Sequence, residues 1–583
     1  MSFLPFEPKL ESSSCERICL SRCQIREKMP VDLQEQCKKS QYLLRYLCGI
    51  PLDTIGIPKY LKKLERSMKG MKNPNLLYSV DKEMFIHIMA NRQDIRDYYI
   101  PIEPNCYLEL DNFLEEIETR MADSVEEFED ISETSKRIEA MFKLMDRMVI
   151  VHENANKPAN HAKDRNDSGS FSSNRKINKR IVLTPAQYNG LRYLIRRKVD
   201  GLGVLEPMIR DPYLEDISCS GLGPIFAEHR IFGGLRTSIG FDTHDSLDKF
   251  VIELAENIKH PVTFRNPCVD ATLADGSRIN IVFGTDVSKR GSNFTIRKFS
   301  PTPMSIIELI QSGALNYEMA AYLSLIIQEQ MNIFIAGETA SGKTTLLNAI
   351  TTFIPPESKV VSIEDTPEVQ VPHPNWIRGV TRGSAKTAEA SDISMFDLLK
   401  AALRQRPNFI IIGEIRGEEG AIAFQAMQSG HACMSTFHAA SVTKLIQRLT
   451  GNPINVPKAY VDNLNLVIIT QMVRLPNGLP ARRVTNISEI VGYDSVSGTF
   501  SYIDSFNWRP LDDTFLFKGN MNSYLLEERI APKRGLPPEK RQQIYAKVKQ
   551  RAEILKRIYA QKITSFQDVH QVLSKAYRDG YFR

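Results

Sequence analysis

The stretch from Gly337 to Thr344 has residue types and spacing that suit phosphate binding. It reads Gly-Glu-Thr-Ala-Ser-Gly-Lys-Thr, directly after an apolar run and directly before a helical pattern, which is the context of a phosphate loop. Glycines let backbone N–H groups curl around phosphate oxygens, and the next helix points its positive end at them. We expect Lys343 to bridge the outer phosphates and Thr344 to offer its hydroxyl to Mg²⁺. The predicted nucleotide-binding residues are Gly337, Glu338, Thr339, Ala340, Ser341, Gly342, Lys343, Thr344 and Thr345.

Two carboxylates end other apolar runs in this half of the chain. Glu414 follows Phe409–Ile412 and Gly413, and a glycine stands where an aspartate is usual for a magnesium site. Glu364 follows the run Val360-Val-Ser-Ile. Carboxylates at strand ends that face a phosphate loop suit a metal–water network and a group that orients the attacking water. Ordinary solvated loop acids are the alternative interpretation.

His431 and His438 flank the short apolar run Ala432–Phe437. A lone histidine is more often structural than catalytic, but two that bracket a strand could report whether a phosphate is bound.

The elements that must position these residues follow from hydrophobic patterning. From Met304 onward, apolar strands alternate with amphipathic helices, which predicts an α/β class with a parallel sheet covered by helices. A mixed α+β domain precedes it, behind a polar linker and an acidic, helical region. The predicted segments are a Cys-rich 1–50, a helical acidic domain at 51–151, a linker at 152–182, an α+β domain at 183–302, a nucleotide-binding core at 303–482 and its extension at 483–583.

Size and charge bound the class of protein. The 583 residues correspond to about four domains of ordinary size. Lys plus Arg number 75 and Asp plus Glu 69, so the formal charge of +6 argues against a nucleic-acid partner. With no secretion signal and no apolar run near the ~20 residues that span a bilayer, the sequence predicts a cytoplasmic protein.

Five of the nine cysteines fall within the first fifty residues. Four thiolates can close a zinc site or hold an iron–sulfur cluster, so a metal centre is one hypothesis. Cys15, Cys19 and Cys23 are four residues apart, which also places them on one face of a helix, where buried thiols pack as small hydrophobes. The candidate ligands are Cys15, Cys19, Cys23, Cys37 and Cys48.

The ordered set of motifs resembles the secretion and type IV pilus ATPase superfamily. The phosphate loop, Ile363-Glu-Asp-Thr-Pro-Glu, Gly413-Glu-Ile-Arg-Gly and His431 with His438 correspond to its Walker A, Asp box, atypical Walker B and His box. Ala340, where bacterial members mostly have glycine, resembles the archaeal branch of pilus-assembly and archaellum motor ATPases. The resemblance implies a RecA-like P-loop ATPase domain after an α+β (PAS-like) domain, with ATP and Mg²⁺ as cofactors.

The family also implies partners. Such proteins form homohexamers at the inner face of the cell membrane and act on pilin-like filament subunits through a polytopic platform protein. Family members supply positive charge to the nucleotide from the domain before the linker, which implies this role for Arg278, Arg290 and Arg297. We assign Glu414 to the magnesium–water network and Glu364 to the attacking water, with the reverse still open. An archaellum motor, a secretion or conjugation ATPase, a DNA translocase and a nucleotide-binding scaffold are the alternatives.

Overall fold

The structure is a computed structural model that describes residues 3–8, 29–65, 68–124, 133–152, 180–299, 302–382, 393–494, 496 and 499–582. The chain divides into two compact units, Met1–Phe299 and Ser300–Arg583. This division lies close to the predicted boundary between residues 302 and 303.

One sheet organises the C-terminal unit. Its strands are β13 Ile333–Gly337, β14 Val360–Glu364, β15 Trp376–Val380, β16 Phe409–Glu414, β17 Ala432–Phe437, β18 Leu466–Arg474, β19 Pro480–Asp494, β20 Thr499–Arg509 and β21 Thr514–Phe517. Their spatial order is β15-β14-β16-β17-β13-β18-β19-β20-β21. The sheet is parallel from β15 to β18 and antiparallel from β18 to β21. The predicted α/β class with a parallel sheet is confirmed.

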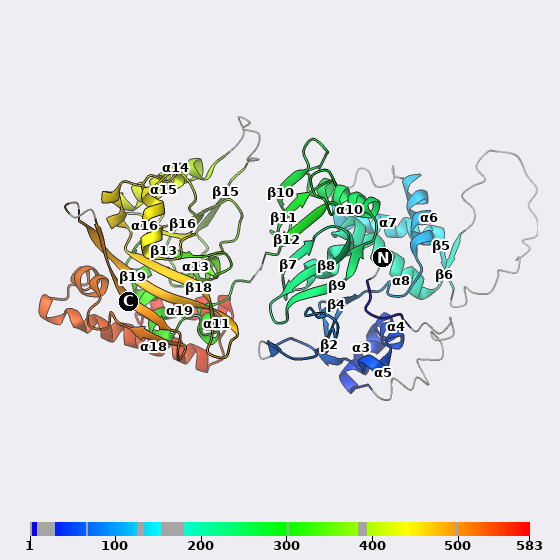
Figure 1. The fold of residues 1–583 in the computed structure, drawn as a ribbon, viewed down its shortest axis with the longest axis horizontal. Helices are drawn as coiled ribbons and strands as arrows, with labels where there is room; N and C mark the ends of the chain where they lie inside the picture. The colour runs from blue at the N-terminus through cyan, green and yellow to red at the C-terminus, as the bar shows by residue number, and fades with distance from the viewer. Residues whose placement is uncertain are drawn as a thin grey trace, which may run out of the picture. The chain divides into compact units, whose positions relative to one another are not determined.

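Helices cover both faces of this sheet (Figure 1). They are α11 Ile306–Gln311, α12 Tyr317–Gln328, α13 Lys343–Thr351, α14 Met395–Arg404, α15 Glu419–Gln428, α16 Val442–Thr450, α17 Ala531–Lys533, α18 Ile544–Ala560 and α19 Phe566–Arg578, together with the 3₁₀-helices η4 Lys458–Asn463 and η6 Pro538–Gln543 and the π-helix η5 Leu525–Ile530. Alternate side chains of β13 enter opposite cores: Ile333 and Ile335 pack with α12, α13 and α18, whereas Phe334 and Ala336 pack with α14, α15 and α16. Within the described ranges, no helix is both long and apolar enough to cross a bilayer.

The predicted boundary between residues 482 and 483 falls inside a strand. Pro480–Asp494 continues the sheet, and the residues that follow contribute two more strands. Side chains of α18 and α19 enter the same core as β13. The final hundred residues are therefore built into the ATPase unit rather than appended to it.

A second sheet organises the N-terminal unit. Its strands, in spatial order, are β1 Lys59–Leu61, β2 Asn75–Ser79, β3 Phe85–Met89, β4 Tyr98–Ile102, β9 Gly233–Phe241, β8 Gly223–His229, β7 Leu214–Cys219, β12 Asn293–Arg297, β11 Arg278–Val282 and β10 Cys268–Thr272. A separate two-stranded pair is β5 Val149–Val151 with β6 Ile181–Leu183. The helical elements are α3 Val31–Lys39, α4 Gln41–Gly49, α5 Leu52–Ile55, α6 Asp111–Ala122, α7 Thr134–Met148, α8 Pro185–Val199, η3 Gly203–Leu205, α9 Glu206–Arg210 and α10 His244–Asn257.

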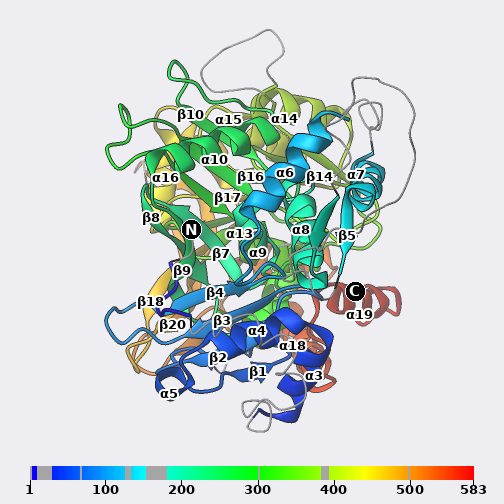
Figure 2. The same ribbon diagram turned by 90° about the vertical axis from the view of Figure 1, so that its right-hand side faces the viewer.

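The predicted helical domain at 51–151 is wrong for residues 59–102, which form strands β1 to β4. The physical reason is packing: all five residues of β3 are buried, and β2 buries its three central residues, so both sides of these short segments meet apolar neighbours. Strand β4 also pairs with β9, with Tyr98 opposite Arg236. The expected separate domains therefore share one sheet, with α3 and α4 beside the first strands (Figure 2).

The described part of the Cys-rich segment is helical, and its two cysteines lie among apolar side chains. Cys37 is buried in a cluster with Leu33 and Leu47, and Cys48 packs against that cluster. Cys15, Cys19 and Cys23 lie outside the described residues. Among the described residues, no group of three or more His, Cys, Asp or Glu side chains could hold a metal ion. The zinc or iron–sulfur hypothesis therefore gains no support.

Candidate functional site

The phosphate loop connects β13 to α13, at the carboxyl edge of the parallel sheet. Gly342 is the N-cap of α13 with φ 93°, a left-handed conformation that glycine adopts readily. Ala340 also has a positive φ, of 60°. The loop is exposed from Glu338 to Ala340, so backbone N–H groups at the helix start can meet an anion. All nine predicted nucleotide-binding residues from Gly337 to Thr345 therefore belong to one loop–helix junction.

Lys343 is buried and turned back toward its own loop. Its Nζ donates to the carbonyl oxygens of Gly337, at 3.0 Å, and Glu338, at 2.9 Å. It also lies 3.3 Å from Nδ1 of His438. The ammonium group is thus held beside the place where the loop would receive phosphate oxygens.

His438 links the loop to the carboxylate that ends β16. Its Nε2 lies 2.8 Å from Oε1 of Glu414, and Arg416 donates to the other carboxylate oxygen at 2.8 Å. Burial lowers the pKa of His438 despite the nearby Glu414, and Lys343, Arg416 and Arg448 lower it further. In a neutral ring Nδ1 can accept from Lys343, whereas Glu414 Oε1, although close to Nε2, has no hydrogen-bond partner among the described residues.

Glu364, at the end of β14, is a buried carboxylate with one oxygen available. Its Oε1 accepts from the backbone N–H groups of Glu368 and Val369, at 2.8 and 2.6 Å. Its Oε2 has no hydrogen-bond partner among the described residues, and the nearest cationic atom is Nε of Arg378, at 3.5 Å. Burial raises the pKa of Glu364 to about 7, although both N–H groups and Arg378 oppose this rise. Such a group suits proton transfer near neutral pH.

Gly413 explains how Glu364 fits. A Cβ at this position would lie 3.1 Å from Cγ of Glu364, closer than about nine in ten real Cβ contacts. A residue larger than glycine here would therefore require the Glu364 side chain on the neighbouring strand to shift by a few tenths of an ångström. The unusual glycine before Glu414 leaves room for a carboxylate that comes from β14 instead.

The two predicted histidines lie at opposite ends of β17. His438 follows the carboxyl end of β17, whereas His431 precedes that strand and lies 3.0 Å from Ser429 Oγ. A strand of six residues separates them by about 20 Å. The structure therefore does not bring His431 together with the phosphate loop, because β17 places it at the opposite edge of the sheet.

The three predicted arginines belong to the N-terminal unit. Arg278 and Arg297 are directly opposite each other on β11 and β12, and Arg278 forms two hydrogen bonds with Asp270, at 3.0 and 2.6 Å. Arg290 lies in the loop at the other end of these strands. The structure thus brings two of the three together.

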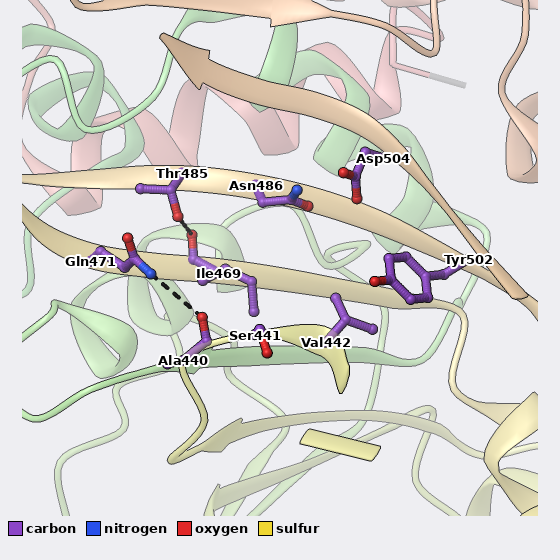
Figure 3. Close-up of a pocket in the computed structure, with 9 residues that line it drawn as sticks. All are labelled: Ala440, Ser441, Val442, Ile469, Gln471, Thr485, Asn486, Tyr502 and Asp504. Carbon is purple, nitrogen blue, oxygen red and sulfur yellow. Dashed lines mark hydrogen bonds between the residues drawn. The ribbon is translucent and has the colours of Figure 1, made fainter. Parts of the chain in front are cut away.

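A hollow of about 300 Å³ opens on the sheet face beside the start of α16 (Figure 3). Its lining residues are Ala440, Ser441, Val442, Ile469, Gln471, Thr485, Asn486, Tyr502 and Asp504. Gln471 donates to Ala440 O at 3.4 Å across it. It contains no cationic side chain, so it is not suited to phosphate.

Three contacts were not foreseen from the sequence. Arg378 approaches Glu364, Thr470 on β18 lies 3.0 Å from Ser341 Oγ in the loop, and Arg482 on β19 donates to Ala340 O at 2.9 Å. Each depends on which strands are neighbours, and no local motif marks these positions.

Comparison with known proteins shows what this chain is similar to. A family model described as "Type II/IV secretion system protein" matches residues 198–488. The type IV secretion system protein PtlH of Bordetella pertussis is 31% identical over 318 residues, which cover 49% of this chain and 93% of PtlH. An uncharacterized protein of the archaeon Methanocaldococcus jannaschii is 42% identical over 552 residues, 94% of this chain and 97% of that protein. The solved VirB11 ATPase of the Brucella suis type IV secretion system, in complex with sulphate, matches 48% of this chain and 91% of its own at 22% identity, with a TM-score of 0.25.

The chain belongs to the type II/IV secretion ATPase superfamily. The archaeal relative is consistent with the archaeal branch that Ala340 indicated.

Proposed function

We propose that this protein hydrolyses ATP and that hydrolysis powers assembly or secretion of type IV pilus-like filament subunits. The observation that carries the proposal is the row of contacts from Lys343 through His438 to Glu414, with the buried Glu364 on the adjacent strand. The contacts join the phosphate loop to Glu414, and Glu364 ends the strand next to the one that carries Glu414, all within one unit.

The residues fit a nucleotide with Mg²⁺. The loop offers backbone N–H groups at the start of α13, a buried ammonium group and the hydroxyl of Thr344. Thr344 would hold the metal directly and Glu414 through water. When bound, Mg²⁺ neutralises charge on the phosphate oxygens.

Glu364 is the better candidate for the base. Its pKa near 7 lets it accept a proton at neutral pH, and its Oε2 keeps acceptor capacity for a water. Glu414 is already paired with Arg416 and in contact with His438, which suits it for orienting rather than for proton transfer.

The proposal includes an assembly. We expect a homohexamer at the inner face of the cell membrane, which acts on pilin-like subunits through a polytopic platform protein. Arginines of the N-terminal unit would approach the phosphates when the two units close. Mass measurement with and without ATP tests the hexamer: a species six times the mass of the chain is expected, and a monomer at every concentration would contradict it.

A secretion system is the second candidate. The names of PtlH and of VirB11 from Bartonella quintana, which is 29% identical over 247 residues, both state a type IV secretion system. In that case the same ATP hydrolysis would serve protein export rather than filament growth.

Substitution of the loop lysine and the strand-end carboxylate tests ATP hydrolysis. Lys343→Ala and Glu414→Gln should each lower turnover by at least about 100-fold, because the first removes the ammonium group that would meet the phosphates and the second removes a carboxylate that would hold Mg²⁺ through water. Arg529→Met, an exposed position in the same unit, is the matched control and should keep wild-type turnover. Near-normal hydrolysis in either site variant would contradict the proposal.

A further inference from the structure

One residue of the phosphate loop has a backbone conformation that its side chain disfavours. Ala340 has φ 60°, in the left-handed region where a Cβ crowds the neighbouring carbonyl. It lies in an exposed part of the loop, so surrounding packing does not enforce this geometry. Ser341 closes a turn around it by donating from its backbone N–H and its Oγ to Glu338 O, and one further contact reaches Ala340 from outside the loop.

Arg482 supplies that contact from a distant part of the chain. Its Nε donates to Ala340 O at 2.9 Å. A Cβ on Gly342 would lie 3.4 Å from Arg482 Cδ, so the stem of the arginine also lies over the second loop residue with positive φ. The arginine therefore touches the loop at both of its left-handed positions.

The neighbouring residue fixes the strand that carries Arg482. Arg483 is buried on the opposite face of β19, and it donates to both carboxylate oxygens of Asp513 at 2.8 Å. It also donates to the carbonyl oxygens of Ser312, at 3.0 Å, and of Arg482 itself, at 2.9 Å. The backbone at Arg482 is thus held firmly, so its side chain reaches the loop from a rigid base.

We infer that Arg482 is a positioning residue that holds the phosphate loop in its nucleotide-binding shape by stabilising the left-handed Ala340. The inference rests on the proposed nucleotide binding. It assigns Arg482 a task in binding rather than in the chemical step, since its observed contact is with the loop backbone.

The test is a double-mutant cycle read by nucleotide affinity. Arg482→Met keeps the aliphatic stem and removes the donor, so it should weaken binding of a fluorescent ADP analogue by about five- to ten-fold. ATP turnover at saturation should change by less than about two-fold, and KM should rise. Ala340→Gly removes the backbone conflict, so in that background Arg482→Met should weaken binding by less than about two-fold.

The outcomes are separable. If Arg482→Met weakens nucleotide binding equally with Ala340 and with Gly at position 340, the inference is overturned. A fall in turnover with unchanged KM would also overturn it. Arg529→Met, which also removes one exposed arginine, should leave affinity unchanged. If the wild-type protein binds no nucleotide, the proposed function fails; if it binds and Arg482→Met binds equally well, only this inference fails.

Discussion

The predicted site residues of the two units differ in burial. In the C-terminal unit, Lys343 and Glu364 are buried, with 8% and 1% of their surface exposed, and backbone groups hold both. In the N-terminal unit, Arg290 and Arg297 are exposed, and Arg278 is paired with Asp270. The phosphate loop and its carboxylates are thus held by contacts within their own unit, whereas the role proposed for the three arginines depends on groups outside theirs.

The largest effect is expected when one arginine of the N-terminal unit is removed. We expect Arg297→Ala to lower turnover by about 100-fold while ADP binding persists, because a guanidinium that acts on closure stabilises the transition state. Arg290→Ala should change turnover by less than about three-fold, since it lies at the other end of β11 and β12. Steady-state kinetics measures turnover in both variants. An equal loss of turnover in Arg297→Ala and Arg290→Ala would contradict the different roles expected for the two arginines.

Burial of Glu364 predicts a gain in stability when its charge is removed. Its pKa rises from 4.5 to about 7 on folding, so folded protein loses stability as pH rises through this range. Glu364→Gln should therefore raise the free energy of unfolding at pH 8 by about 2–3 kcal/mol, and by much less near pH 4.5. Urea unfolding at the two pH values measures this; destabilisation at pH 8 would show that the carboxylate is better solvated than its burial indicates.

The close approach between β14 and β16 predicts a smaller effect. Gly413→Ala should cost about 1–2 kcal/mol, because its Cβ would press on the Glu364 side chain. In a Glu364→Ala background the same change should cost less than about 0.5 kcal/mol. The control is Gly492→Ala, whose Cβ would come no closer than 3.9 Å to another group. If thermal unfolding shows that Gly413→Ala costs the same with Glu364 as with Ala at position 364, the close approach to Glu364 is not the cause of the cost.

How far the sequence predicts the site depends on whether its parts are contiguous. The phosphate loop and its helix could be predicted, because their residues are consecutive and each has a known task. The contact between Arg482 and Ala340 could not, because the two residues are 142 positions apart and meet only through the order of β13, β18 and β19. Glu364 and Gly413 were visible separately, but not as a pair.

The errors have physical causes as well. His431 and His438 looked equivalent because they flank one apolar run, yet a strand separates its two flanks by its full length. The strands between residues 59 and 102 were missed because each is only three to five residues long, too short to show a clear period.

The central claim is that one unit holds both the phosphate loop and the base, and Glu364→Gln tests it most directly. ATP binding and single-turnover hydrolysis would be measured on the same preparation of wild-type and variant protein. We predict ATP affinity within about three-fold of wild type and hydrolysis slowed by at least about 100-fold. Hydrolysis at the wild-type rate with bound ATP would contradict the account.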